Sequence, residues 1–405
     1  MSIPSERAER NLYWKRNLLI CLFGSFTTLV AMTLMLPFLP LYVQQLGVQG
    51  QANIAQWSGI AYGATFLTAG LVAPLWGRLG DRYGRKPMLI RASLGMALTM
   101  GLMGCATTLW QLVGLRLVAG LAGGYSSGAT IMVASQAPRN RSTWALGLLS
   151  SGVMAGNLAG PLIGGFVPPL IGIRMTFLGA GCLIFIAFLA TALLIRETPQ
   201  SARVEAHTKN GWRDIPNKRL VLTMLGTGVL LMVANMSIEP IVTLYIRTLN
   251  TTPTQVTFIA ALVMSAAALG SIVSASSVGR LADRVGYHTV ITGALTISGL
   301  LLVPQAFVTT GSQLIGLRFL MGLSLGGLLP CLTAVIRHNV PDHRVGSIMG
   351  AAISAQYAGQ VAEPLLGGFI GGQIGMRAVF LGTSILLVLG ATGNWFVLRL
   401  PPQKH

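Results

Sequence analysis

Apolar windows of about 20 residues recur along the entire chain, and each is long enough to cross the hydrocarbon core of a bilayer as a helix. Only 9% of the 405 residues are Asp, Glu, Lys or Arg, whereas an ordinary soluble domain has about 25%. The sequence shows none of the alternating segments of about ten residues that are typical of a membrane β-barrel. It therefore predicts an all-α polytopic membrane protein.

Twelve transmembrane helices are predicted, six on each side of a polar segment at 196–218. They span roughly 17–40, 54–77, 88–107, 109–132, 144–167 and 173–195, and then 219–243, 255–278, 288–308, 311–335, 345–368 and 376–398. The first apolar run is a full span, so we interpret it as a helix and not as a cleaved signal peptide. The predicted domains are a six-helix bundle at 1–195, a cytoplasmic linker at 196–218 and a second bundle at 219–405.

The basic residues are distributed unevenly between the two sides that these helices define. Most of the 28 Lys and Arg residues fall in the terminal segments and in the loops on the same side. The opposite loops hold only Arg174, Arg247 and Arg377. Because basic loops stay cytoplasmic, we predict cytoplasmic termini and a bacterial inner membrane. The net charge of +18 is then a topology signal, and we expect no nucleic-acid partner.

The second half of the sequence repeats the first at a nearly constant offset. "PFLPLYV" at 37–43 corresponds to "PIVTLYI" at 240–246, and "GPLIGG" at 160–165 corresponds to "EPLLGG" at 363–368. Because each half holds an even number of helices, the two copies share one orientation in the membrane. This is the relation between the two halves of major facilitator transporters, and two such halves can rock about a central site.

A short charged segment interrupts the apolar sequence twice. "GRLGDRYGRKP" at 77–87 carries five charged side chains, and "GRLADRVGYHT" at 279–289 is its second copy, in which Tyr287 and His288 replace an Arg-Lys pair. Glycines allow a tight turn, and the charges can form an ionic latch that holds one conformer, weaker in the second copy. The alternative is a solvated loop that only sets topology. Candidate gating residues are Gly77, Asp81, Arg82, Gly84, Arg85, Asp283 and Arg284.

These motifs resemble the signatures of a known transporter superfamily. The 77–87 segment resembles the signature loop of the major facilitator superfamily, and "LVGLRLVAGLAGG" at 112–124 resembles its span-four signature. "GVMAGNLAGPLIGG" at 152–165 resembles the span-five signature of its exporters. The signature positions there are Gly156, Gly160, Pro161, Gly164 and Gly165.

Other segments narrow the resemblance to one branch of that superfamily. "PFLPLYVQQLG" at 37–47 resembles the span-one motif of the twelve-span drug:proton antiporters, and "WKRNLL", "WALG" and "RAVFL" resemble MdtG-type multidrug transporters. The resemblance implies two parallel six-helix bundles around a central cavity. It also implies export of small amphipathic compounds in exchange for protons by alternating access, with the span-five glycines favouring export.

Few ionisable residues lie within the predicted spans, where a charge costs about 2.5–3.5 kcal/mol on insertion scales. The acids well inside are Glu239 and Glu363, each directly before a proline that can break the helix locally. Such a carboxylate can exchange protons near neutral pH or pair with a cationic drug. We predict Glu239 as the main coupling site and Glu363 as the second, with Arg116 and Arg318 as partners. The alternatives are carboxylates bonded structurally to another helix, and arginines that extend to the interface.

A drug pocket requires aromatic and flexible apolar side chains with a few polar groups. Asn157 and Asn235 are the preferred lining residues, because an amide in hydrocarbon seeks a partner. Further candidates, which could instead be packing or lipid-facing residues, are Met32, Met35, Phe38, Tyr42, Tyr125, Met236 and Tyr357.

Other functional classes have little support in the sequence. It lacks GxSxG, HExxH and the nucleotide-binding Gly-x4-Gly-Lys-Ser/Thr motif, and its 5 histidines lack metal-ligand spacing. We therefore expect no enzyme, no cofactor and no metal. The expected partners are a small-molecule substrate, protons and the lipid bilayer, with the chain as a monomer. A second hypothesis of the same class is a dedicated exporter of an endogenous metabolite such as a siderophore or an antibiotic.

Overall fold

A computed structural model describes residues 3–138, 141–197, 218–236, 238–249 and 255–399, and these residues form helices joined by short connections. The chain divides into two compact units, Met1–Phe38 with Thr68–Val204 (unit 1) and Leu39–Leu67 with Glu205–His405 (unit 2). The division differs from the predicted domains because residues 39–67 group with the second half. The boundaries at 195 and 219 stay a prediction.

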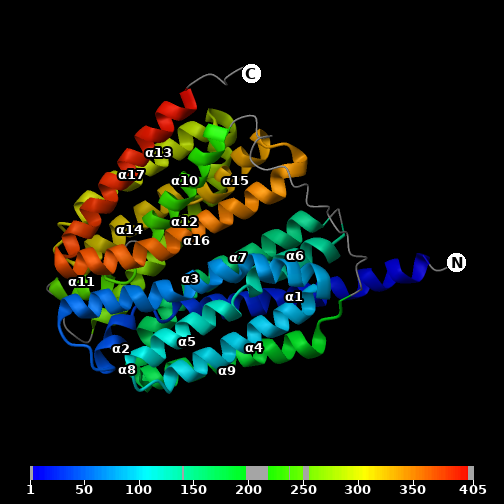
Figure 1. Ribbon diagram of the computed structural model, residues 1–405, viewed down its shortest axis with the longest axis horizontal. Coiled ribbons are helices and arrows are strands. Elements are labelled where there is room, and N and C mark those ends of the chain that lie inside the picture. The colour runs from blue at the N-terminus through cyan, green and yellow to red at the C-terminus, as the bar shows by residue number, and fades with distance from the viewer. Residues whose placement is uncertain (1–2, 139–140, 198–217, 237, 250–254, 400–405) are drawn as a thin grey trace. The chain divides into compact units, whose positions relative to one another are not determined.

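The described helices that lie wholly in unit 1 are labelled in Figure 1. They are α1 (Ile3–Thr33), α4 (Arg85–Gly104), α5 (Leu109–Ala122), α6 (Tyr125–Gln136), α7 (Ser142–Phe166), α8 (Pro168–Ile171) and α9 (Ile173–Leu194).

The remaining described helices lie in unit 2, except that α3 (Gln51–Tyr83) belongs to unit 2 up to Leu67 and to unit 1 from Thr68. They are α2 (Leu39–Gln45), α10 (Lys218–Met236), α11 (Val242–Thr248), α12 (Val256–Val285), α13 (Tyr287–Gln305), α14 (Gly311–Leu325), α15 (Leu328–Asn339), α16 (Asp342–Gln373) and α17 (Met376–Arg399).

Eleven helical segments among the described residues are long and apolar enough to cross a membrane. The predicted span at 345–368 lies in α16, whose 32 residues make a helix of about 48 Å. This helix is long enough to cross, but Gln356, Gln360 and Glu363 make it more polar than the others. The predicted all-α polytopic fold is confirmed, and its most polar span is the one that carries a candidate acid.

The two halves of the chain have the same helix breaks, as their repeated sequences predict. Spans four and ten are each interrupted by a glycine pair, and the second glycine has a positive φ, 103° at Gly124 and 80° at Gly327. Only glycine takes such a φ at little cost, so each span forms two helices, α5 with α6 and α14 with α15. The repeat also extends to the helix starts, where Thr108 and Thr310 accept the backbone N–H of Gln111 and Gln313.

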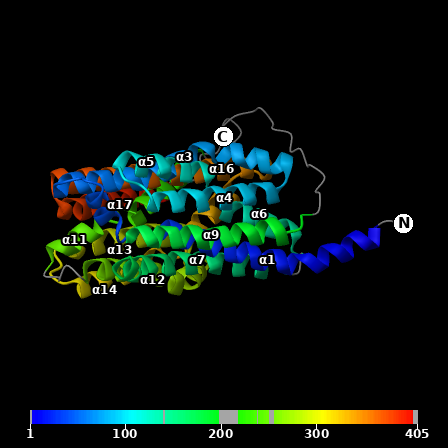
Figure 2. The same ribbon diagram turned by 90° about the horizontal axis from the view of Figure 1, so that it is seen from below.

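Helix packing within each unit follows the repeat as well. In unit 1, α1 packs on α7, and α4 lies beside α9 (Figure 1 and Figure 2). The corresponding pairs in unit 2 are α10 with α16 and α13 with α17. Small residues permit the close approach of membrane helices. For example, a Cβ at Gly372 of α16 would lie 2.7 Å from the carbonyl oxygen of Ala52 on α3, within unit 2.

Candidate functional site

A cluster of ionisable side chains lies inside unit 2. Glu239 lies in the turn between α10 and α11, where Pro240 has no N–H to continue the helix. Its side chain is partly buried, and its Oε2 accepts a hydrogen bond from the Tyr62 hydroxyl at 2.7 Å. The Tyr62 ring packs edge-on against Phe66, with 5.2 Å between the ring centroids. The α3 segment of unit 2 therefore positions one carboxylate through a phenol.

Glu363 and Arg318 form the more deeply buried part of the cluster. They are 3% and 4% exposed, and the charge of Arg318 acts on both Glu363 and Glu239. Both carboxylate oxygens of Glu363 and the Nε of Arg318 are buried and have no hydrogen-bond partner among the described residues. Buried polar groups in proteins are nearly always paired, so this arrangement is typical of a functional site.

The composition of the cluster determines what it can bind. Two carboxylates face a single guanidinium, so one negative charge is uncompensated when both acids are ionised. Such a charge inside a membrane protein is costly unless it is neutralised. A proton or a cationic group of a substrate can neutralise it, and only one of them can do so at a time.

The other predicted site residues within the spans have surroundings of their own. Arg116 is 2% exposed in α5 of unit 1, so it does not extend to the protein surface as the alternative required. Asn157 is partly buried in α7 of unit 1. Asn235 donates a hydrogen bond from its Nδ2 to the carbonyl oxygen of Leu231 in its own helix at 2.9 Å. Its amide therefore already has one partner within the protein.

Two of the aromatic pocket candidates are packing residues of unit 1. The Tyr125 hydroxyl lies 2.8 Å from the hydroxyl of Thr191, and both side chains are buried. Phe38 packs edge-on against Phe177, with 5.4 Å between the ring centroids. The polar group of Tyr125 is thus engaged within the unit, and the sequence could not show this because the partner lies on a distant helix.

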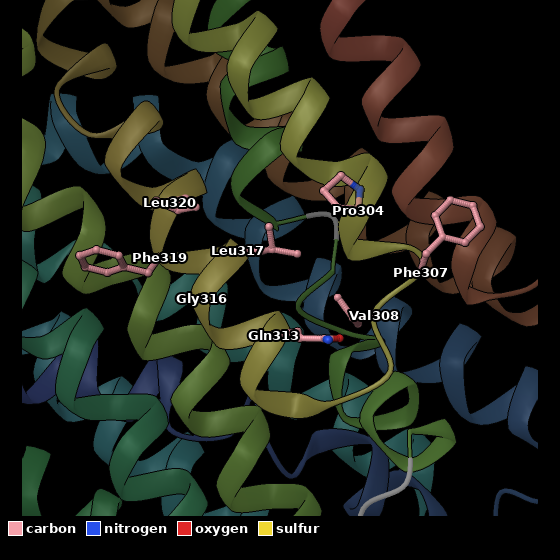
Figure 3. A pocket seen from close by; sticks show the side chains of 8 residues that line it. All are labelled: Pro304, Phe307, Val308, Gln313, Gly316, Leu317, Phe319 and Leu320. Atoms are coloured by element: carbon pink, nitrogen blue, oxygen red, sulfur yellow. The ribbon is translucent and has the colours of Figure 1, made fainter.

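A groove of about 730 Å³ lies between α13 and α14 (Figure 3). It is lined by Pro304, Phe307, Val308, Gln313, Gly316, Leu317, Phe319 and Leu320. Gln313 is the one polar side chain among them, and Phe307 is 58% exposed. The lining offers no group that exchanges a proton, so we place the candidate site at the ionisable cluster.

The first charged signature segment is helical almost throughout, which corrects the predicted loop. Helix α3 continues to Tyr83 and α4 begins at Arg85, so Gly84, with φ 95° and ψ 165°, makes the whole turn. Glu197, which follows α9, accepts the first two N–H groups of α4 on its two carboxylate oxygens. The distances are 2.6 Å from the Arg85 nitrogen and 2.7 Å from the Lys86 nitrogen. A carboxylate is favourable there because the helix N-terminus carries a partial positive charge.

The sequence analysis did not predict the contact that Glu197 makes with the start of α4. Glu197 lies at the start of the predicted linker, and no local motif marks it. The only signal was its position directly after a span in a chain with only 10 acidic residues.

The other gating candidates take varied positions at the ends of α3 and α12. A Cβ at Gly77 would meet no neighbouring atom within 4 Å. The guanidinium carbon of Arg82 lies 5.3 Å from the ring centroid of Tyr83. Asp81 belongs to the last turn of α3, but its side chain lies outside the described residues.

The second copy of the segment uses a different bond. Helix α12 ends at Val285, Gly286 makes the turn with φ 100°, and α13 begins at Tyr287. The Tyr287 hydroxyl donates to Oδ1 of Asp283 at 2.6 Å, and Arg284 is exposed. The residue that departs from the first copy therefore engages the acid of its own segment.

Arg91, which the sequence analysis did not single out, binds the break between α5 and α6. It lies in α4, and its guanidinium donates to the carbonyl oxygens of Leu121 and Gly123, both at 2.8 Å. The guanidinium carbon also lies 3.7 Å from the Trp76 ring centroid. The Trp76 Nε1 donates a hydrogen bond to the carbonyl oxygen of Leu121 at 2.9 Å. Arg91 thus satisfies carbonyl groups that the break between α5 and α6 leaves without helical partners.

The exporter signature forms the contact between α7 and α1. Its glycines recur every four residues and therefore share one face of α7, and Pro161 and Gly165 are buried beside them. A Cβ at Gly156 or Gly160 would lie 2.9 Å from a main-chain carbonyl oxygen of α1, that of Phe26 or Val30 respectively. A Cβ at Gly164 would overlap the carbonyl oxygen of Leu34, the residue directly after α1. These glycines therefore let α7 approach the α1 backbone closely, and their role in export stays a prediction.

Repeated helical halves, broken helices and a charged cluster beside a break together define a polytopic secondary transporter. The sequence matches the family model of the Major Facilitator Superfamily over residues 21–247 and 224–405. The chain belongs to the Major Facilitator Superfamily, as the resemblance predicted.

Individual relatives and solved structures agree with this assignment. The chain is 42% identical over 388 residues to "Multidrug resistance protein MdtG" of Salmonella paratyphi A, covering 95% of this chain and 96% of the relative. It is 40% identical over 406 residues to the protein of the same name from Klebsiella pneumoniae (strain 342), covering 98% of each. The predicted resemblance to MdtG-type proteins is thus confirmed.

The similar solved structures confirm the fold alone. A bacterial homologue of the human lysosomal transporter Spinster matches with a TM-score of 0.77 and 14% identity, covering 96% of this chain and 97% of that one. The nucleoside transporter NupG matches with a TM-score of 0.75 and 13% identity, covering 94% and 100%.

Proposed function

We propose that this protein exports small amphipathic compounds from the cytoplasm in exchange for protons, with Glu239 and Glu363 as the coupling groups. The observation that carries the proposal is the buried, unpartnered carboxylate of Glu363 beside Arg318 and the Tyr62–Glu239 hydrogen bond. The multidrug resistance names of its relatives and the α7 glycine contact that resembles the exporter signature support the direction of transport.

The two acids have different tasks in this proposal. Glu239 is partly exposed, so it is the group that exchanges protons with water. Glu363 is buried and lacks a donor, so it takes the second place, as the group that a substrate cation can approach. Because the proton and the cation neutralise the same excess negative charge, the binding of one releases the other, and this mutual exclusion is the coupling that antiport requires.

The setting of the protein follows from its basic loops and its family. We propose a bacterial inner membrane with both termini in the cytoplasm, because the basic loops lie on the side of the termini. The chain acts as a monomer in this proposal, since unit 2 alone provides every member of the cluster.

Substrate-induced proton movement in everted vesicles tests the proposal. The vesicles have an acidic interior and a pH-sensitive dye, and the panel contains cationic dyes, neutral antibiotics and anionic bile salts. We expect the wild type to release protons when substrate is added. In Glu239→Gln the amount released should fall at least about tenfold, because removing one proton-transfer group lowers the rate roughly 10²–10⁴-fold in catalytic systems. Glu363→Gln should lose cation-dependent release, and Tyr62→Phe should lose severalfold because Glu239 is no longer positioned.

Asp214→Asn, which removes a carboxylate from the polar linker segment, is the matched control and should respond like the wild type. A normal response of Glu239→Gln would contradict its role. Proton release by no member of the panel would contradict broad drug export and favour a dedicated metabolite exporter.

A further inference from the structure

Two arginines of unit 1 converge on a single tyrosine at one end of the helices. The guanidinium carbon of Arg16 on α1 and that of Arg196, which follows α9, each lie 4.9 Å from the ring centroid of Tyr13. The Arg196 Nη1 also donates to the Tyr13 hydroxyl at 3.0 Å. Both guanidinium groups therefore carry their positive charge near the same ring, and an anion bound beside that ring is attracted by both.

The position of Arg196 is fixed by its backbone. Asn17, which is 2% exposed, donates its Nδ2 to the Arg196 carbonyl oxygen at 2.7 Å, and its Oδ1 accepts from the Arg196 N–H at 3.3 Å. The next residue, Glu197, is held by the N-terminus of α4. The chain is therefore attached to two helices at consecutive residues, so the backbone from which the exposed Arg196 side chain extends is held in place.

Arg16 has two hydrogen-bond donors that lack an acceptor among the described residues. The Nε and Nη2 of Arg16 are buried and have no hydrogen-bond partner among the described residues. Both carboxylate oxygens of the neighbouring Glu197 already accept main-chain N–H groups of α4. A guanidinium with two adjacent donors to spare has the geometry to bind a phosphate through a pair of parallel hydrogen bonds.

The surroundings indicate that the phosphate belongs to a lipid. Arg16 lies near the start of the apolar span Tyr13–Thr33, and Arg196 comes two residues after the span that ends at Leu194. Both arginines therefore lie at a boundary between apolar and polar sequence. On the membrane side of that boundary, Leu19 and Leu193 are 59% and 76% exposed, and they offer a surface for acyl chains. Free phosphate would gain nothing from these leucines.

We propose that Arg16 and Arg196 bind the phosphate group of an anionic phospholipid at the cytoplasmic end of unit 1. The site has no equivalent in the other half of the repeat, where Leu220 occupies the position of Asn17 and cannot hold a backbone in the same way. The binding is independent of the charged cluster of unit 2, so lipid and substrate act on different parts of the protein.

The test is a lipid titration of the purified full-length protein in detergent, followed by its thermal unfolding. The probes are phosphatidylglycerol, phosphatidylcholine and inorganic phosphate. We expect phosphatidylglycerol to raise the unfolding temperature at low molar ratios, whereas the other two raise it little. The double variant Arg16→Gln/Arg196→Gln should weaken the apparent affinity for phosphatidylglycerol by at least about tenfold, the size expected for losing charge-assisted hydrogen bonds.

Lys15→Gln is the matched control, because it removes one positive charge from the exposed side of the same helix turn and should change the affinity less than about twofold. An equal loss in Lys15→Gln would overturn the proposal in favour of nonspecific charge, and an equal effect of inorganic phosphate would overturn the lipid assignment. If the double variant does not fold, Arg16→Lys decides: it keeps the charge but loses the planar donor pair, and an unchanged affinity would overturn the proposal.

Discussion

Gly84 and Glu197 meet at the turn between α3 and α4, and together they show what a single residue of the signature contributes. A Cβ at Gly84 would lie 2.8 Å from a carboxylate oxygen of Glu197, and the backbone there has φ 95° and ψ 165°, which only glycine adopts readily. The need for glycine was predictable from the motif. Its acidic neighbour was not, because the two residues are far apart in the sequence.

We predict that Gly84→Ala destabilises the protein by about 1–3 kcal/mol, from the strained backbone, and by more because the Glu197 carboxylate must move. Gly286→Ala should show the backbone cost alone, since φ is 100° but no atom lies within 4 Å of the Cβ position. Gly77→Ala has neither problem and should be neutral or stabilising by up to about 1 kcal/mol. Thermal unfolding in one detergent compares all three, and equal losses in Gly84→Ala and Gly286→Ala would contradict the role of Glu197.

At the scale of elements, α7 and α1 show how a small-residue pattern becomes a helix pair. The four-residue spacing puts the glycines on one face, but it does not identify α1 as the partner, because a glycine face fits any helix that presents its backbone. Helix ends were also hard to predict. Hydropathy falls where charged residues begin, whereas α3 and α12 continue as helices through those residues to Tyr83 and Val285, since Arg and Leu are both good helix formers.

The α7 contact gives a prediction with an internal control. Gly164→Ala should destabilise the protein by about 1–3 kcal/mol, the usual cost of overpacking, because the new methyl group overlaps the carbonyl of Leu34, which directly follows α1. Gly147→Ala lies on the same helix in open space and should be neutral or slightly stabilising. Thermal unfolding and membrane expression levels measure the difference, and equal stability of the two variants would argue against a tight α1–α7 contact.

At the scale of the whole molecule, the sequence predicted the repeat and the candidate acids but not how the acids are surrounded. The breaks at Gly124 and Gly327 follow from matching glycine pairs, so symmetry was readable from the sequence. The hydrogen bond from Tyr62 to Glu239 was not, because Tyr62 has no motif and lies in the part of α3 that groups with the second half of the chain. The charge of Arg318 acts on both acids, and its role as their partner stays a prediction, as does that of Arg116.

The predicted orientation can be tested on the whole molecule by cysteine labelling. The background variant lacks the free cysteines Cys21, Cys105, Cys182 and Cys331. In intact cells, a membrane-impermeant maleimide should label Gln49→Cys, which is exposed between spans one and two. It should label Arg141→Cys, exposed between spans four and five, only after the membrane is opened. The reverse pattern would place the termini outside.

Glu363 occupies in the second repeat the position that Gly160 holds in the first. In the first repeat this position lies against α1, and in the second it carries a buried charge. One position cannot serve both needs, since a close helix contact requires the smallest side chain. Duplication therefore removed a conflict that an ancestral six-helix unit would have faced, because each copy could specialise. A substitution at Glu363 therefore leaves the α1–α7 contact of the first repeat untouched.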